Sequence, residues 1–301
     1  MDRLTLCLGA ILVNLTVYSA FAQADMYYVV ASESNAVYQV GPASPFIESN
    51  SLNEENGVLI GGVNGLAYNP TTGEHYLVYW EQGVGPNVRW LGTVDFAAMT
   101  VQTVGLLFDK IAALACNSAG QLYGITGDGG QNPNVLHLID PNAPETPNEV
   151  ANFSTTIDDD GEALAFHPAT GPNVLYRLAG GSYFYKVDLE SMSQELITDA
   201  LYDGGTCGHA IHSHGDGFVT MATFFCTMSM QGGQYDCSPE FMPCVKGMVP
   251  AQSTGVVDAL NSEAVLVSVR DLAGRIVTRR CNVPQLLIYS DGTVQKSFCF
   301  E

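Results

Sequence analysis

Gly65-Leu66-Ala67-Tyr68-Asn69-Pro70 opens a pattern that this chain uses three times. The phrase returns 48 residues later as Ala113-Leu114-Ala115-Cys116-Asn117-Ser118, and after 50 more as Ala163-Leu164-Ala165-Phe166-His167-Pro168. Each copy is followed by a turn that contains glycine and then by two further apolar runs. Repeats of about 40 to 50 residues built from four short strands are typical of propeller blades. The sequence therefore predicts an all-β fold, a β-propeller of four-stranded antiparallel blades.

The number of blades follows from the other units along the chain. Clear units run from about 59 to 105, 109 to 153 and 158 to 201, and a divergent copy begins at Ile211. A part-unit over 27–40 lacks its opening strand, which we expect the C-terminal end to supply, because closing the ring removes two exposed sheet edges. A last unit is expected between 263 and 298. We predict six blades, with five or seven as the alternatives.

The first 24 residues have the pattern of a secretory signal peptide. An apolar stretch over 4–17 is followed by small residues that offer an A-x-A cleavage site. The stretch is shorter than the roughly 20 residues needed to span a membrane. We therefore expect a secreted, extracellular protein with no membrane anchor. Residues 25–301 are predicted to form a single propeller domain with a disulfide-rich insertion at about 226–249.

The chain has eight cysteines, and Cys7 lies in the predicted signal peptide. Cys116 occupies the repeat position of Tyr68 and Phe166, so we expect a buried thiol that acts as a small apolar core residue. The remaining cysteines are predicted to form disulfides, with local spacing favouring Cys237–Cys244 or Cys226–Cys237 among the 15 pairings that six cysteines allow. They are Cys207, Cys226, Cys237, Cys244, Cys281 and Cys299. Asn152-Phe153-Ser154 is an N-glycosylation sequon, which makes Asn152 a predicted glycosylation site.

The formal net charge is −20. Such a surface repels nucleic acid and attracts cations and basic proteins. The partners expected from charge and secretion are an extracellular protein, a glycan, or a mineral or cation, with Ca²⁺ as the candidate cofactor and no nucleic acid.

The three clear units resemble those of six-bladed secreted propellers. The stretch 63–67, Val-Asn-Gly-Leu-Ala, is similar to the Asn-Gly-Leu phrase of the SMP-30, gluconolactonase and strictosidine-synthase-like group. The stretch 160–166 resembles a blade opening of esterase-like, phytase-type propellers. The resemblance implies a divalent metal at the mouth of the central channel, held by residues at the starts of the innermost strands. Matched by register, the metal candidates are Asn64, Asp160, Glu162 and His209; the alternative is that Asn64 and Glu162 cap turns.

Three of the six histidines lie within six residues, at 209, 212 and 214. His212 and His214 share one face of a strand, because strand side chains alternate with a period of two. They are therefore candidate ligand-binding residues. The alternative for His212 is a half-buried core position, because it corresponds to Tyr68, Cys116 and Phe166.

Two functions fit these features. The sequence lacks a Gly-x-Ser-x-Gly elbow, a His-Glu-x-x-His pair and a P-loop. The favoured hypothesis is therefore a secreted acidic propeller that acts as a non-catalytic extracellular binding or matrix protein. It includes association with calcium and a role in a mineralised matrix. The alternative is a metal-dependent lactonase or esterase-like hydrolase with a cation at the channel mouth.

Overall fold

The structure is a computed structural model that describes residues 26–41, 48–85, 87–153, 162–180, 183–199, 210–221, 224–235, 237, 244–251, 266–270, 285–289 and 294–297. The chain divides into two compact units, Met1–Ala251 and Gln252–Glu301, and each is described by itself. The predicted signal peptide lies outside the described residues.

The first unit consists of five four-stranded antiparallel blades. From the axis outward, the first contains β21 (Val245–Pro250), β1 (Tyr27–Ala31), β2 (Ala36–Val40) and β3 (Glu48–Ser51). The second contains β5 (Ile60–Tyr68), β6 (His75–Glu81), β7 (Trp90–Asp95) and β8 (Thr100–Leu106), with β4 (Asn53–Glu54) added in parallel to β8. The third contains β9 (Ile111–Cys116), β10 (Leu122–Thr126), β11 (Val135–Ile139) and β12 (Glu149–Asn152). The fourth contains β13 (Glu162–Phe166), β14 (Val174–Ala179), β15 (Tyr183–Asp188) and β16 (Ser193–Thr198). The fifth contains β17 (Ala210–His214), β18 (Gly217–Met221), β19 (Phe225–Ser229) and β20 (Gln234–Tyr235).

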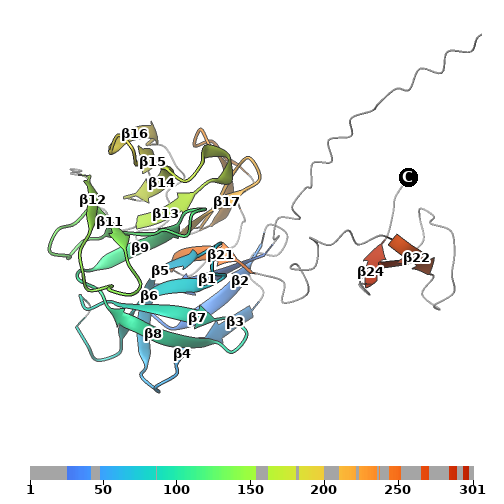
Figure 1. Ribbon diagram of the computed structural model, residues 1–301, viewed down its shortest axis with the longest axis horizontal. Helices are drawn as coiled ribbons and strands as arrows, with labels where there is room; N and C mark the ends of the chain where they lie inside the picture. Colours follow the sequence, from blue (N-terminus) through green and yellow to red (C-terminus); the bar gives the residue numbers. More distant parts are fainter. Residues whose placement is uncertain are drawn as a thin grey trace, which may run out of the picture. The chain divides into compact units, whose positions relative to one another are not determined.

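The innermost strands form a closed ring. Each of β5, β9, β13, β17 and β21 contacts the next, and β21 contacts β5 to complete the circle. Figure 1 shows these strands in the middle of the unit, with β3, β8, β12 and β16 at its periphery. The all-β propeller prediction is confirmed, with five blades, one fewer than the six favoured and within the expected range.

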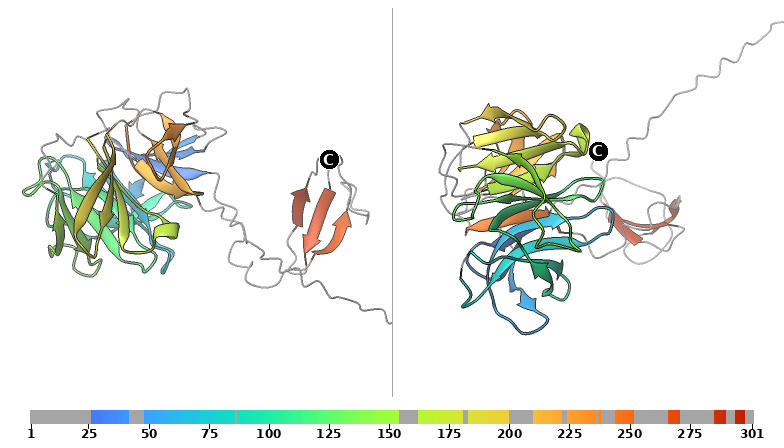
Figure 2. Two further views of the ribbon diagram at one scale, coloured as in Figure 1. Left: turned by 90° about the horizontal axis from the view of Figure 1, so that it is seen from above. Right: turned by 60° about the vertical axis from the view of Figure 1, so that its left-hand side comes forward.

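Ring closure uses a different segment from the one expected. The strand missing from the N-terminal part-unit is β21, which pairs with β1 from Tyr27↔Pro250 to Ala31↔Val245. Residues 226–249, expected to be an insertion, instead contain most of β19, all of β20 and most of β21, so they complete one blade and begin another. Residues expected to form a last blade make the sheet of the second unit, β22 (Leu266–Arg270), β23 (Gln285–Tyr289) and β24 (Val294–Ser297), coloured orange to red in Figure 2.

The recurring phrase corresponds to the end of an innermost strand and the turn after it. The leucine of each copy packs between blades and is almost fully buried. Its exposed fraction is 2% for Leu66, 3% for Leu114 and 5% for Leu164. The glycine of each following turn, Gly73 or its counterparts at 120 and 171, has a φ near +80°, which only glycine adopts without strain.

A buried polar side chain at the fifth position of the phrase ties each of these three blades to the next. The Asn69 amide accepts a hydrogen bond from the Thr71 main-chain N–H and donates one to the carbonyl of Gly120 in the next blade. The Asn117 amide likewise accepts from its own turn and donates to the Pro172 carbonyl at 3.2 Å. The third position is His167, which caps the short helix η1 (Pro168–Thr170) and packs against a ring of the following blade. The repeat therefore encodes both the blade and the joint between blades.

Two of the predicted disulfide cysteines are bonded to each other. Cys226 on β19 is bonded to Cys237, one of the two local pairings expected from spacing. Cys244 is also disulfide-bonded. Cys207, Cys281 and Cys299 lie outside the described residues. Asn152, at the end of β12, is exposed, so its side chain is accessible; its glycosylation stays a prediction.

Candidate functional site

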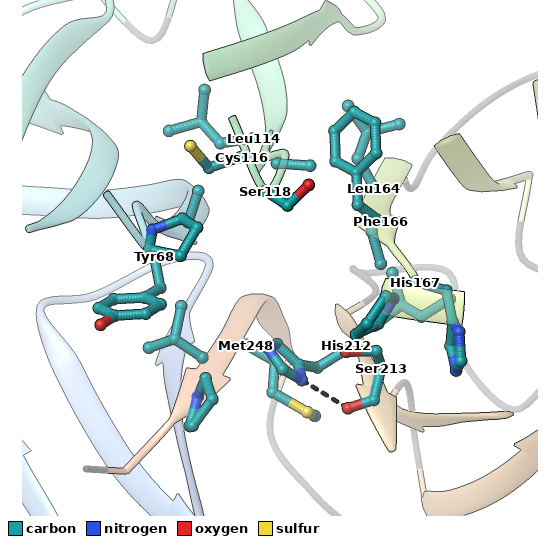
Figure 3. Close-up of a pocket in the computed structure, with 18 of the residues that line it drawn as sticks. Tyr68, Leu114, Cys116, Ser118, Leu164, Phe166, His167, His212, Ser213 and Met248 are labelled. Carbon is teal, nitrogen blue, oxygen red and sulfur yellow. Dashed lines mark hydrogen bonds between the residues drawn. The ribbon is translucent and has the colours of Figure 1, made fainter. Parts of the chain in front are cut away.

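A pocket of about 270 Å³ lies where the C-terminal halves of the five innermost strands meet (Figure 3). Every blade contributes to its wall, and most of the wall is apolar. The lining side chains and main-chain segments belong to Leu66, Ala67, Tyr68, Pro70, Leu114, Ala115, Cys116, Ser118, Leu164, Ala165, Phe166, His167, Pro168, Gly171, Ile211, His212, Ser213, Met248, Val249 and Pro250. None of these residues is acidic, and none is lysine or arginine.

The fourth position of the repeated phrase forms much of this wall. Tyr68, Cys116, Phe166 and His212 occupy equivalent positions, and all four are half-buried and line the pocket. Figure 3 shows them arranged around the hollow, each from a different innermost strand. Cys116 is a free thiol that packs against the core, as expected, but it is half-buried and not buried, because the strands leave the axis open at this end.

The mouth of the pocket is formed by the sixth and last position of the repeated phrase. Pro70, Ser118 and Pro168 line the pocket and are exposed to solvent. The pocket is therefore open on this side rather than sealed inside the propeller.

Burial disfavours the charged forms of three groups in the pocket lining, Cys116, His167 and His212. It raises the pKa of the Cys116 thiol to about 12 and lowers that of the His212 imidazole to about 4, with His214 and His167 lowering the latter further by repulsion. Burial also lowers the pKa of His167. At neutral pH the pocket therefore presents an uncharged surface.

His212 has a defined hydrogen-bonding state. Its Nδ1 lies 2.8 Å from the main-chain oxygen of Ser213 (Figure 3). A carbonyl oxygen only accepts hydrogen bonds, so Nδ1 carries the proton of the neutral ring and Nε2 is left as an acceptor.

His214 shares a strand face with His212, as the period of two predicts. Both rings pack against Tyr27, with centroids 5.6 Å away for His212 and 6.2 Å for His214. The Tyr27 hydroxyl is hydrogen-bonded to His214 Nδ1 at 2.7 Å. Only His212 lines the pocket, so the structure gives the two predicted ligand-binding histidines different surroundings.

Of the predicted metal ligands, Glu162 lies at the other end of its innermost strand. Glu162, at the start of β13, is 1% exposed and pairs with the fully buried Arg177 of β14. Arg177 Nε donates to Glu162 Oε2 at 3.0 Å and Nη2 donates to Oε1 at 2.6 Å, while Nη2 also donates to Asn134. Both carboxylate oxygens thus serve an ion pair, so Glu162 does not fit the role of a metal ligand.

The other predicted ligands do not complete a cation site in the described part of the chain. Asn64 Oδ1 is buried without a hydrogen-bond partner there, and Asp160 and His209 lie outside the described residues. A calcium ion takes roughly 6 to 8 oxygens. Within the described ranges, no group of three or more His, Cys, Asp or Glu side chains is placed to hold a metal ion. A metal at the channel mouth stays a prediction.

Sequence reasoning missed Arg177 and the pocket itself. Arg177 had a visible signal, since it is a single cation inside the apolar strand Val174–Ala179 and opposite charge is what makes such burial tolerable. The pocket had a weaker signal in the sequence. The fourth position of the phrase varies between Tyr68, Cys116 and Phe166, whereas the leucine and alanine before it are constant.

The fold is that of a five-bladed β-propeller with an axial pocket. No protein-family model matches the chain, and no curated protein matches it significantly. A solved structure that matches is a chain in the crystal structure of a nidogen/laminin complex, with 9% identity, a TM-score of 0.46, and coverage of 74% of this chain and 97% of that one. Among the residues that the structure describes, no helix is long and apolar enough to cross a membrane.

Proposed function

We propose that this chain is a secreted, acidic, non-catalytic binding propeller, and that the axial pocket is its binding site. The observation that carries the proposal is the construction of the pocket: all five blades line it, its wall is mostly apolar, and it opens to solvent at the exposed positions 70, 118 and 168. Concave, largely apolar pockets with few polar groups are the usual form of small-ligand sites.

The size of the pocket sets the size of its occupant. A dry cavity of about 150 Å³ holds a benzene molecule. The present pocket, at about 270 Å³, is nearly twice as large. It therefore has room for a two-ring group, either a small molecule or a side chain of another protein.

The state of the titratable groups favours binding over hydrolysis. A general base works best with a pKa near the operating pH, and His212, at about 4, is far below that range. The nucleophilic form of cysteine is the thiolate, and Cys116 with a pKa of about 12 remains a thiol. Glu162, the carboxylate that a hydrolase at the channel mouth would need, is paired with Arg177.

Extracellular location and cation association are part of the same proposal. The signal-like N-terminus and the Cys226–Cys237 disulfide both favour an oxidising compartment. The net charge of −20 favours weak, distributed association with Ca²⁺ or with a basic or calcium-bearing matrix partner.

The test is binding of naphthalene, an apolar two-ring probe, to the purified secreted protein, followed by NMR. We expect saturable binding that Cys116→Phe abolishes by filling the pocket. Ser118→Phe, at the exposed mouth, is a second blocking variant, and Gln102→Phe on the exposed outer strand β8 is the matched control. Binding that both blocking variants leave unchanged would refute the pocket as the site. Calcium titration of the same samples tests the cation proposal, for which weak multi-site binding is expected.

A further inference from the structure

The pocket wall is rich in aromatic rings and sulfur. Tyr68, Phe166 and His212 contribute rings from three different innermost strands, and Cys116 and Met248 contribute sulfur atoms (Figure 3). Aromatic groups pack well edge-to-face or offset against such rings, and sulfur makes favourable contacts with ring edges. This lining fits a flat aromatic occupant better than a flexible aliphatic chain.

The His212 ring provides a directed polar feature of this wall. Its Nδ1–H donates to the Ser213 carbonyl, and the ring packs in a tilted orientation against the Tyr27 ring, so the imidazole is held in place. No hydrogen bond joins Nε2 to another described residue. A neutral imidazole in this tautomer accepts a hydrogen bond at Nε2 and cannot donate one there.

The charge of the pocket excludes ionic ligands. Among the described residues, no Asp, Glu, Lys or Arg side chain lines it, and moving an unpaired charge into an apolar site is costly. An occupant that is uncharged and carries one hydrogen-bond donor brings no unpaired charge into the pocket and can pair its donor with His212 Nε2.

We propose that the axial pocket binds an uncharged aromatic group of the indole or phenol kind, whose N–H or O–H donates a hydrogen bond to Nε2 of His212. This inference rests on the proposed binding function and names the ligand class. The same chemistry occurs in a free small molecule and in a tryptophan or tyrosine side chain of a partner protein.

Indole and 1-methylindole form the test pair, because they share the ring but only indole has an N–H donor. Dissociation constants are measured by NMR titration for the wild type and for His212→Phe, which keeps a ring and removes the acceptor. The quantity compared is the ratio of the 1-methylindole constant to the indole constant. A net hydrogen bond corresponds to roughly a two- to tenfold change, so the ratio should fall by that factor in His212→Phe. His137→Phe replaces a buried histidine that packs in a tilted orientation against Phe108 outside the pocket lining; it is the matched control and should leave the ratio unchanged.

The outcomes separate this inference from the proposed function. If neither indole binds, the proposed binding site fails as well. If both bind and His212→Phe leaves their ratio unchanged, the binding site stands and the role of His212 is refuted; should His212→Phe fail to fold, a ratio of one or less in the wild type refutes it equally. N-acetyltryptophanamide distinguishes the sources: binding that depends on His212 supports a protein side chain, and binding of indole alone supports a free small molecule.

Discussion

The buried pair of Glu162 and Arg177 makes the sharpest prediction about stability. Arg177 is fully buried and Glu162 is 1% exposed. The guanidinium donates two hydrogen bonds to the carboxylate, one to Asn134 and one to Gln194, and it lies over the rings of Phe153 and Tyr185. Replacing Glu162 by Gln removes the negative charge that accepts two of the hydrogen bonds from this buried guanidinium.

The expected cost follows from these contacts. Each hydrogen bond to a charged group contributes about 1.5 to 3 kcal/mol, and removing one partner of a buried ion pair costs about 3 to 5 kcal/mol. We expect Glu162→Gln to lower the free energy of unfolding by about 3 to 5 kcal/mol, a large fraction of the roughly 5 to 15 kcal/mol of a typical domain.

Urea unfolding followed by circular dichroism measures this loss. The double variant Glu162→Gln/Arg177→Met removes the buried charge together with its partner, so it should lose less than the sum of the two single variants, by about 1 to 3 kcal/mol. Glu195→Gln, on the exposed face of β16, is the control and should stay within about 0.5 kcal/mol of the wild type.

One result would refute the reasoning. If Glu162→Gln cost less than about 1 kcal/mol and also abolished a tight Ca²⁺ site, the carboxylate would be a metal ligand, and the ion pair would be secondary. The channel-mouth metal implied by the family resemblance would then be restored.

Three further predictions concern the stability of the propeller. Gly65→Ala places a methyl group 2.8 Å from a main-chain nitrogen of β9, so we expect a loss of about 1 to 3 kcal/mol in urea unfolding, whereas Gly85→Ala, with open space around it, should be nearly neutral. His75 has its pKa lowered to about 4 by burial, so the unfolded state takes up its proton first as pH falls. The stability that depends on neutral His75 is thus lost as the pH falls from about 6.5 to about 4. In His75→Phe the urea midpoint should therefore fall less steeply over that range than in the wild type. Asn117→Ala removes a fully buried amide that joins two blades and should cost about 1 to 3 kcal/mol by thermal unfolding, while the exposed Asn142→Ala should change stability by less than about 0.5 kcal/mol; equal losses would show that the joint between blades is not what Asn117 stabilises.

The sequence by itself determined the blade and its local chemistry. The phrase ending at Pro70 and its two copies specify an inner strand and a glycine turn, because both depend on residues close together in the chain. Alternation placed His212 and His214 on one face for the same reason, and short spacing brought Cys226–Cys237 into the choice of two local disulfides.

Only the tertiary structure decided the number of blades, the closing strand and the place of the pocket. Closure joins β1 to β21, more than 200 residues away in the chain, and such a pairing leaves no local pattern. Arg177 binds Glu162 from the adjacent strand and also donates a hydrogen bond to Asn134 of the previous blade. The role of the carboxylate was therefore not visible in the residues next to Glu162 in the sequence. The fourth position of the phrase predicted a core residue; whether its side chain meets another side chain or an open axis depends on how closely five inner strands converge.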